Sequence, residues 1–267
     1  MNTQPPSGHS GEMPFHPHGH SKAIERPGPP PSAPRRLRMA ILVSRREHCL
    51  AHLLQLHRRG ELRCEIPLII SNHLDLQPLA AAYGIPFRHV SVQRGSKHLA
   101  EAVQLGLLHT YRVDFIALAR YMQVLSAGFV RHYENRIINI HHSLLPAFAG
   151  SHAYQRAHDR GVKIIGATAH YVTEALDDGP IIEQDAIRVS HRDSVQDLMR
   201  KGAHLENKVL ARAIKWHIGN QVMVHLNRTL VFDYDQYLAR SLRDKEQFSP
   251  GGSGAGLDSA RALPTPS

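Results

Sequence analysis

The chain has 267 residues, of which 42% are hydrophobic, and it carries a formal net charge of +9. A chain of this length and apolar content can bury a substantial core, which indicates a globular protein. No window approaches the roughly 18–20 continuous apolar residues that a membrane helix needs, and the N-terminus lacks the apolar stretch of a secretory signal. We therefore expect a cytoplasmic protein that does not bind membranes.

The cysteines and the charge exclude further classes. Cys49 and Cys64 fit neither a disulfide framework nor a metal-ligand spacing, so they are interpreted as ordinary thiols in a reducing compartment. Residues 1–38 carry +3 of the net charge and residues 240–267 carry +1, which leaves +5 for the middle of the chain. This mild excess can attract an acidic small molecule. Because no basic stripe is interleaved with aromatic residues, we expect no nucleic acid partner.

Both ends of the chain have the composition of unfolded segments. Residues 1–38 are rich in Pro, Gly, Ser and His and show no periodicity, so they cannot bury enough apolar surface to offset chain entropy. Residues 234–267 are expected to form a C-terminal extension that is largely disordered. The first tail contains four histidines that could bind metal weakly, although a passive tail is the favoured interpretation; they are His9, His16, His18 and His20. A single folded domain is predicted over residues 39–233.

Short β-rich runs alternate with helix-length amphipathic segments in the first part of this domain. The runs are MAILV (39–43), EIPLIIS (65–71), IPFRHV (85–90), FIALA (115–119) and RIINI (136–140). Helices are expected after the first two runs and over residues 97–110. Strands separated by helices predict an α/β, Rossmann-like fold, with a mostly parallel sheet that carries helices on both faces. Ligands of such sheets normally bind at the carboxyl ends of the strands.

The pattern changes after the fifth run. Residues 162–172 and 180–189 read as two strands of a hairpin joined by the long loop TEALDDG. A helix is predicted from about Ser194 to His217, with Ser194 and Asp197 as its N-terminal cap. The segments QVMVH and RTLVF follow as a short β pair.

The first strand-to-helix turn, VSRREHC, contains no glycine. A dinucleotide or phosphate cradle needs glycine-rich backbone at this place, so a nicotinamide or flavin enzyme is not expected. Ser44 with Glu47 is interpreted as a capping box. Arg45 and Arg46, near the predicted helix start, could still attract an anion.

The segment INIHHSLLPAFAG carries the first candidate chemistry. In a strand, Asn139 and His141 point to one face while Ile138 and Ile140 point to the other. A neutral amide donor beside a group that exchanges a proton near neutral pH can stabilise an oxyanion. Polar residues at a strand end are also often simple loop anchors, and these two residues alone leave both interpretations open.

The loop EALDDGP supplies a third candidate group. Asp-Gly is ordinary turn chemistry, so Asp178 with Gly179 is first interpreted as structural. Asp177 follows His170 by seven residues and could fold back over the site, where its carboxylate would favour the charged form of His141. No Ser or Cys is placed as a nucleophile, which predicts direct attack by water or an amine on a carbonyl, without a covalent intermediate.

Several motifs together resemble the formyltetrahydrofolate deformylases, a branch of the folate-dependent formyltransferases. They are NIHHSLLPAFAG, GVKIIGATAHYVTEALDDGPIIEQD, VSHRDSVQDLMRKG, LARYMQVLS and IPLIISNH. The resemblance implies hydrolysis of 10-formyltetrahydrofolate to tetrahydrofolate and formate, which supplies formate and balances one-carbon folate pools for purine synthesis. It implies that Asn139, His141 and Asp177 form the catalytic set. Asp177 would activate and position water, directly or through His141, while the other two would stabilise the oxyanion.

The resemblance also implies where the substrate binds. The pterin is expected to hydrogen-bond mainly to backbone, along residues 122–125 and 172–177. The substrate-binding residues implied are Met122, Gln123, Val124, Leu125, His170 and Val172. No metal and no cofactor are implied, since the folate is the substrate, and a homo-oligomer is expected. Deformylases usually carry an N-terminal ACT-type regulatory domain; a Pro-rich tail stands in its place, so we expect a family member that lacks this domain.

Three alternative functions remain open. Glycinamide ribonucleotide transformylases have a His-Pro-Ser pattern at the active strand and a glycine-rich first turn, whereas this chain has His141-His142-Ser143 and no such turn. Hydrolysis is therefore favoured over formyl transfer to an amine. A folate-binding protein with little turnover is the second alternative, and a His-rich metal-binding protein is the third.

Overall fold

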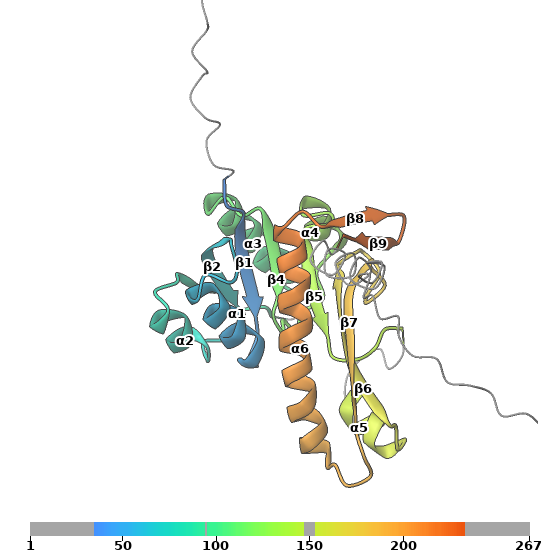
Figure 1. Cartoon of the computed structure of the whole chain (residues 1–267). Coiled ribbons are helices and arrows are strands. Elements are labelled where there is room, and N and C mark those ends of the chain that lie inside the picture. Colours follow the sequence, from blue (N-terminus) through green and yellow to red (C-terminus); the bar gives the residue numbers. More distant parts are fainter. Residues whose placement is uncertain (1–34, 94, 147–152, 233–267) are drawn as a thin grey trace, which may run out of the picture. The chain divides into compact units, whose positions relative to one another are not determined.

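The computed structural model describes residues 35–93, 95–146 and 153–232 (Figure 1). Nearly all of both predicted tails, including the four tail histidines, lies outside these residues. The expected tail disorder and the proposed domain boundaries therefore stay predictions. Among the described helices, none is long and apolar enough to cross a membrane.

The centre of the domain is one seven-stranded sheet with the order β3-β2-β1-β4-β5-β6-β7. Its strands are β1 (Arg38–Val43), β2 (Glu65–Ser71), β3 (Phe87–His89), β4 (Phe115–Leu118), β5 (Ile137–His141), β6 (Ile164–Tyr171) and β7 (Ile181–Arg188). The first five strands are parallel, whereas β6 runs antiparallel to both β5 and β7. The predicted mostly parallel sheet is confirmed.

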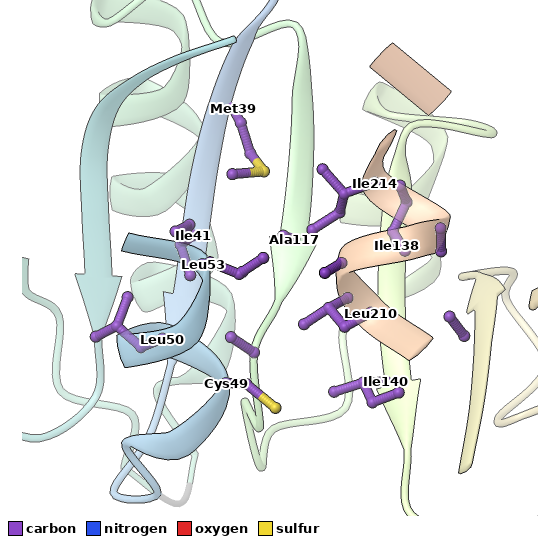
Figure 2. Packing of buried hydrophobic residues seen from close by; sticks show 14 of the residues in the cluster. Met39, Ile41, Cys49, Leu50, Leu53, Ala117, Ile138, Ile140, Leu210 and Ile214 are labelled. Carbon is purple, nitrogen blue, oxygen red and sulfur yellow. The ribbon is translucent and has the colours of Figure 1, made fainter. Parts of the chain in front are cut away.

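Helices cover both faces of the sheet, as predicted (Figure 1). They are α1 (His48–Arg58), α2 (Gln77–Ala82), α3 (Lys97–Thr110), α4 (Ala127–His132), α5 (Ala153–Asp159) and α6 (Val195–Ile218). Alternate residues of β1 enter two separate apolar clusters: Met39 and Ile41 pack with α1 and α6, while Ala40 and Leu42 pack with α3 and α4. Figure 2 shows the first cluster, in which Leu53 lies close to β1. Burying each large apolar side chain contributes about 1.5–3 kcal/mol.

Helix α6 begins at the predicted cap. Ser194 Oγ accepts a hydrogen bond from the Asp197 backbone N–H at 3.2 Å, and Asp197 Oδ2 accepts one from the Ser194 backbone N–H at 3.0 Å. This reciprocal pair satisfies two of the helix's free N–H groups, which fixes where the helix starts. The apolar side of α6 then packs against β5, β6 and β7.

The capping box predicted at the start of α1 is wrong. Helix α1 follows Glu47 with no side-chain cap. Ser44 is buried instead, and its hydroxyl donates to Asn72 Oδ1 at 2.7 Å and accepts from the Met122 backbone N–H at 3.0 Å. Ser44 ends up at the carboxyl edge of β1, where the loops after β2 and β4 offer partners from elsewhere in the chain. One hydroxyl thereby ties three strand-to-helix loops together.

The predicted short β pair forms a separate two-stranded sheet of β8 (Val222–His225) and β9 (Arg228–Val231). Its turn holds the loop that precedes β7. Asn227 Nδ2 donates to the Asp178 backbone carbonyl at 2.9 Å, and Thr229 Oγ1 donates to the Ile181 carbonyl. The hairpin therefore braces the loop that carries Asp177.

Candidate active site

A cavity of about 310 Å³ opens at the carboxyl ends of β4 and β5. Its walls are the end of β4 with the segment that follows it to residue 125, the end of β5 with His142, and the end of β6 with the loop that leads to β7. This is the edge where a parallel sheet is expected to bind its ligand. Its volume lies in the range of pockets that enclose a small molecule.

Strand β5 places Asn139 and His141 on the cavity side, as the alternation in the sequence predicted. Ile138 and Ile140 belong to the apolar cluster beneath, where Figure 2 shows them beside Leu210 and Ile214 of α6. The two isoleucines anchor the strand through burial. The polar pair is consequently held on a rigid element.

Asp177 reaches this pair by folding back over the strand. Its Oδ2 lies 3.2 Å from His141 Nδ1, and its backbone has φ = 54°, a left-handed conformation that Asp tolerates better than most residues. The hydrogen bond from His141 lowers the Asp177 pKa below its usual value, against the opposing effect of partial burial. The residue is therefore an ionised carboxylate at neutral pH.

Contact with Asp177 occupies one of the two ring nitrogens of His141. An ionised carboxylate can only accept hydrogen bonds, so His141 donates to it through Nδ1. The other ring nitrogen, Nε2, is buried and has no hydrogen-bond partner within the described residues. This nitrogen is the atom that is left to meet a bound group.

His170 lines the same cavity and lies beside Asn139. Its Nδ1 is 2.9 Å from the Tyr171 carbonyl oxygen, which requires Nδ1 to be the donor. Its Nε2 is 3.1 Å from Asn139 Nδ2 and accepts that amide hydrogen. Burial lowers the His170 pKa, in agreement with a neutral ring. His170 was predicted from the sequence as a substrate-binding residue, whereas its contact with Asn139 was not predicted.

The other residues predicted to contact substrate line the cavity; they are Met122, Gln123, Val124, Leu125 and Val172. Met122 and Val124 are 60% and 56% exposed, which makes them an apolar rim. Tyr121 instead points into the core, where its hydroxyl accepts from Gln104 Nε2 at 2.9 Å. The strip 122–125 thus lines the cavity and places the exposed apolar residues Met122 and Val124 at its edge.

Gly179 is required because the loop that carries Asp177 passes very close to the backbone at the end of β6. A Cβ atom at this position would lie 1.7 Å from the Tyr171 backbone oxygen. Any side chain would push the loop away from β6. Gly179 therefore has a structural role, as predicted for the Asp178-Gly179 pair. Asp177, which precedes this pair, is the residue of the loop that reaches His141.

A second polar cluster, which was not predicted from the sequence, surrounds Glu206 of α6. Its buried carboxylate lies 2.9 Å from His48 Nε2 and accepts from the Tyr154 hydroxyl at 2.7 Å, with Arg120 Nε at 3.5 Å. Burial opposes ionisation, yet these partners together lower the Glu206 pKa. The signal in the sequence was a glutamate on the apolar side of an amphipathic helix, four residues after Gly202.

Three potential metal ligands meet within this cluster: His48, Cys49 and Glu206 lie within 4.8 Å of one another. Burial raises the Cys49 pKa well above its usual value, so the thiol is protonated and a poor ligand. Arg120 also supplies a cation to the same carboxylate. The donor set therefore fits an ion-pair network better than a metal centre.

Comparisons with known proteins agree with the site. The formyl transferase family profile matches residues 37–214. A formyltetrahydrofolate deformylase from Synechocystis is 55% identical over 195 residues, covering 73% of this chain and 68% of the relative. The Bacillus subtilis deformylase is 51% identical over 196 residues, covering 73% and 65%. The chain thus spans about two thirds of the length of these curated relatives.

Solved structures give the same result. A formyltetrahydrofolate deformylase from Pseudomonas syringae superposes with a TM-score of 0.74 at 48% identity, covering 75% of this chain and 67% of that one. Glycinamide ribonucleotide transformylase 1 from Symbiobacterium toebii gives 0.71 at 31% identity, covering 74% and 95%. The chain therefore belongs to the formyl transferase family and, within it, groups with the formyltetrahydrofolate deformylases.

Proposed function

We propose that this protein hydrolyses 10-formyltetrahydrofolate to tetrahydrofolate and formate, and thereby supplies formate and balances the one-carbon folate pools used for purine synthesis. The observation that carries the proposal is the convergence of Asn139, His141 and Asp177 around one cavity, in a chain 44–55% identical to proteins named formyltetrahydrofolate deformylase. Matching transformylase structures include several that are more distant, at 28–33% identity.

Each of the three side chains has a role in the proposed reaction. Water adds to the formyl carbon while Asp177 positions it and accepts its proton, directly or through His141. Asn139 Nδ2–H and His141 Nε2–H donate to the oxyanion of the tetrahedral intermediate. The C–N10 bond then breaks, N10 takes up the proton that was removed from the water, and formate is released. Loss of one oxyanion donor typically raises the barrier by about 3–4 kcal/mol.

The folate is proposed to lie along the strip 122–125 and the loop 172–177. Backbone N–H and C=O groups of these segments would hydrogen-bond to the pterin, as the family resemblance implies. The exposed side chains of Met122, Val124 and Leu176 would cover its rings, because apolar contact with water-excluding side chains favours aromatic ligands. Val172 and Gln123 complete the walls.

We further propose that the enzyme uses no resident metal or redox cofactor. An ionised carboxylate, an imidazole and an amide suffice for hydrolysis of an activated formamide by acid–base and oxyanion catalysis. Two buried free thiols, Cys49 and Cys64, are compatible with the reducing cytoplasm proposed as its location. Its partners would be the folate, water and further copies of the same chain in a homo-oligomer, with no nucleic acid and no membrane.

The test is release of formate from 10-formyltetrahydrofolate by the purified full chain with no amine present. We expect one formate per tetrahydrofolate formed, and no acceleration by glycinamide ribonucleotide. Formate release that depends on an added amine would instead assign formyl transfer. Folate binding without release of formate would assign a binding protein.

A further inference from the structure

A second cavity, of about 480 Å³, adjoins the active site. We call it the arginine cavity, because its wall includes Arg46, Arg120 and Arg200. It lies over α1, α5 and α6, and it shares Arg120 and His142 with the catalytic cavity. The proposed reaction does not use this cavity. One of the two shared residues, His142, lies directly beside His141.

The arginine cavity has an excess of positive charge. Glu206 is the carboxylate in its wall, and it faces His48 and Arg120. Arg200 at the rim pairs with Asp197 at 2.8 Å. Three guanidinium groups therefore face two carboxylates even when every histidine is neutral. Such a pocket attracts small anions.

Arg120 lies in the wall of both cavities. Its side chain is only 14% exposed, and its Nε lies 3.5 Å from Glu206 Oε2, so the buried carboxylate holds the guanidinium group in place. A guanidinium group carries several N–H donors and binds carboxylates through charged hydrogen bonds, so a small carboxylate is a suitable ligand for the cavity that Arg120 lines.

The two cavities are separated by a residue that carries no charge. The His142 ring lies 5.1 Å from the His141 ring and 5.7 Å from the Tyr154 ring. Burial, together with Arg120 and His141, lowers the His142 pKa to about 4. A neutral ring at this boundary neither traps an anion nor repels it.

We propose that the arginine cavity binds the formate released at His141 while tetrahydrofolate still fills the catalytic cavity. Formate is an anion at neutral pH and forms next to the ionised Asp177, which repels it. Arg120 attracts it from the adjoining cavity. Formate thereby leaves past Arg120 and Arg46 instead of past the folate. This inference rests on the proposed hydrolysis, which produces the formate.

The test measures binding of ¹³C-formate by NMR line broadening to the full chain saturated with tetrahydrofolate. We expect saturable binding by the wild-type protein, weakened at least fivefold in Arg120→Gln and about twofold to threefold in Arg46→Gln. Arg45→Gln is the matched control, since Arg45 is an exposed neighbour outside the cavity wall, and its binding should be unchanged.

Steady-state kinetics give a second readout. We expect formate to be a noncompetitive inhibitor against 10-formyltetrahydrofolate, and we expect this inhibition to be weaker in Arg46→Gln. Formate that fails to bind once tetrahydrofolate is present, or that binds equally to wild type and Arg46→Gln, would overturn the inference. Because the NMR measurement needs no turnover, it is independent of the hydrolysis assay. A protein that hydrolyses but does not bind formate keeps the proposed function and loses this inference.

Discussion

His141 Nδ1 and Asp177 Oδ2 lie 3.2 Å apart, although one residue ends β5 and the other lies in the loop between β6 and β7. Replacing Asp177 with Asn keeps the size of the side chain and removes its negative charge. We expect Asp177→Asn to lower kcat for formate release at least 100-fold, with KM changed less than threefold, because the charge acts mainly on the transition state.

The matched control is Asp178→Asn. Asp178 is the adjacent carboxylate, it is exposed, and it lies outside the cavity wall. Steady-state rates for both variants check the assignment. Equal rates in the two variants would remove the proposed role of Asp177.

The Asn139–His170 contact predicts that these residues act as one unit. Asn139→Ala should lower kcat about 100-fold, in the range expected for loss of an oxyanion donor. His170→Phe removes the acceptor for the Asn139 amide, so it should lower kcat about tenfold with little change in KM. In the double variant the two losses should not add.

A double-mutant cycle on kcat measures this coupling. His204→Phe is a suitable control for loss of an imidazole, since His204 lies on α6 away from the cavity wall. Fully additive losses for Asn139→Ala and His170→Phe would show that His170 does not orient the amide.

The buried histidines predict that the fold is weakened by acid. The pKa values of His142 and His217 are lowered to about 4, chiefly by burial, and those of His52 and His170 are also lowered. Each therefore binds a proton more readily when unfolded. Above the unfolded pKa of about 6.5 the histidines are neutral in both states and the fold keeps its full stability. As pH falls from about 6.5 toward 4, the unfolded state binds protons that the folded state does not, so the free energy of unfolding decreases.

Urea unfolding at pH 7.5 and pH 5 measures the effect. We expect the free energy of unfolding to fall by on the order of 3 kcal/mol between these values. His217→Phe, in contact with Phe115 and Tyr171, should show a smaller decrease. A stability that is constant over this interval would contradict neutral buried rings. Asp177 does not reverse the trend. Because its pKa is lowered, the stability that its carboxylate contributes is lost only at a still lower pH.

Gly179 predicts a loss of activity through backbone displacement. In Gly179→Ala the new Cβ would meet the Tyr171 carbonyl, and since both sides are backbone the loop with Asp177 must move. We expect kcat to drop at least tenfold, with a decrease in unfolding free energy of about 1–3 kcal/mol. Gly106→Ala in α3, where no atom lies within 4 Å, is the control and should be neutral or slightly stabilising.

What the sequence could predict followed from local patterns. The alternation of apolar runs and helices located β1 to β5 along the chain, and the period of two residues along β5 put Asn139 and His141 on one face. Asp177 was found because its loop follows a strand of the same sheet. These signals lie within short segments, so no knowledge of distant contacts was needed.

The errors arose where partners come from distant segments. Ser44 looked like a local cap, but it bonds to Asn72 and Met122 after two other strands. The cluster around Glu206 joins α1, α5, α6 and the segment after β4, and no single segment shows it. Short helix α5 also went unpredicted, since seven residues carry little periodicity.

The brace that Asn227 and Thr229 place on the Asp177 loop has a consequence for biosynthesis. A nascent chain that has emerged only through α6 already contains all three polar groups, yet the segment that steadies the carboxylate is still inside the ribosome. Catalytic competence should therefore arrive late on the ribosome, after most of the sheet has formed.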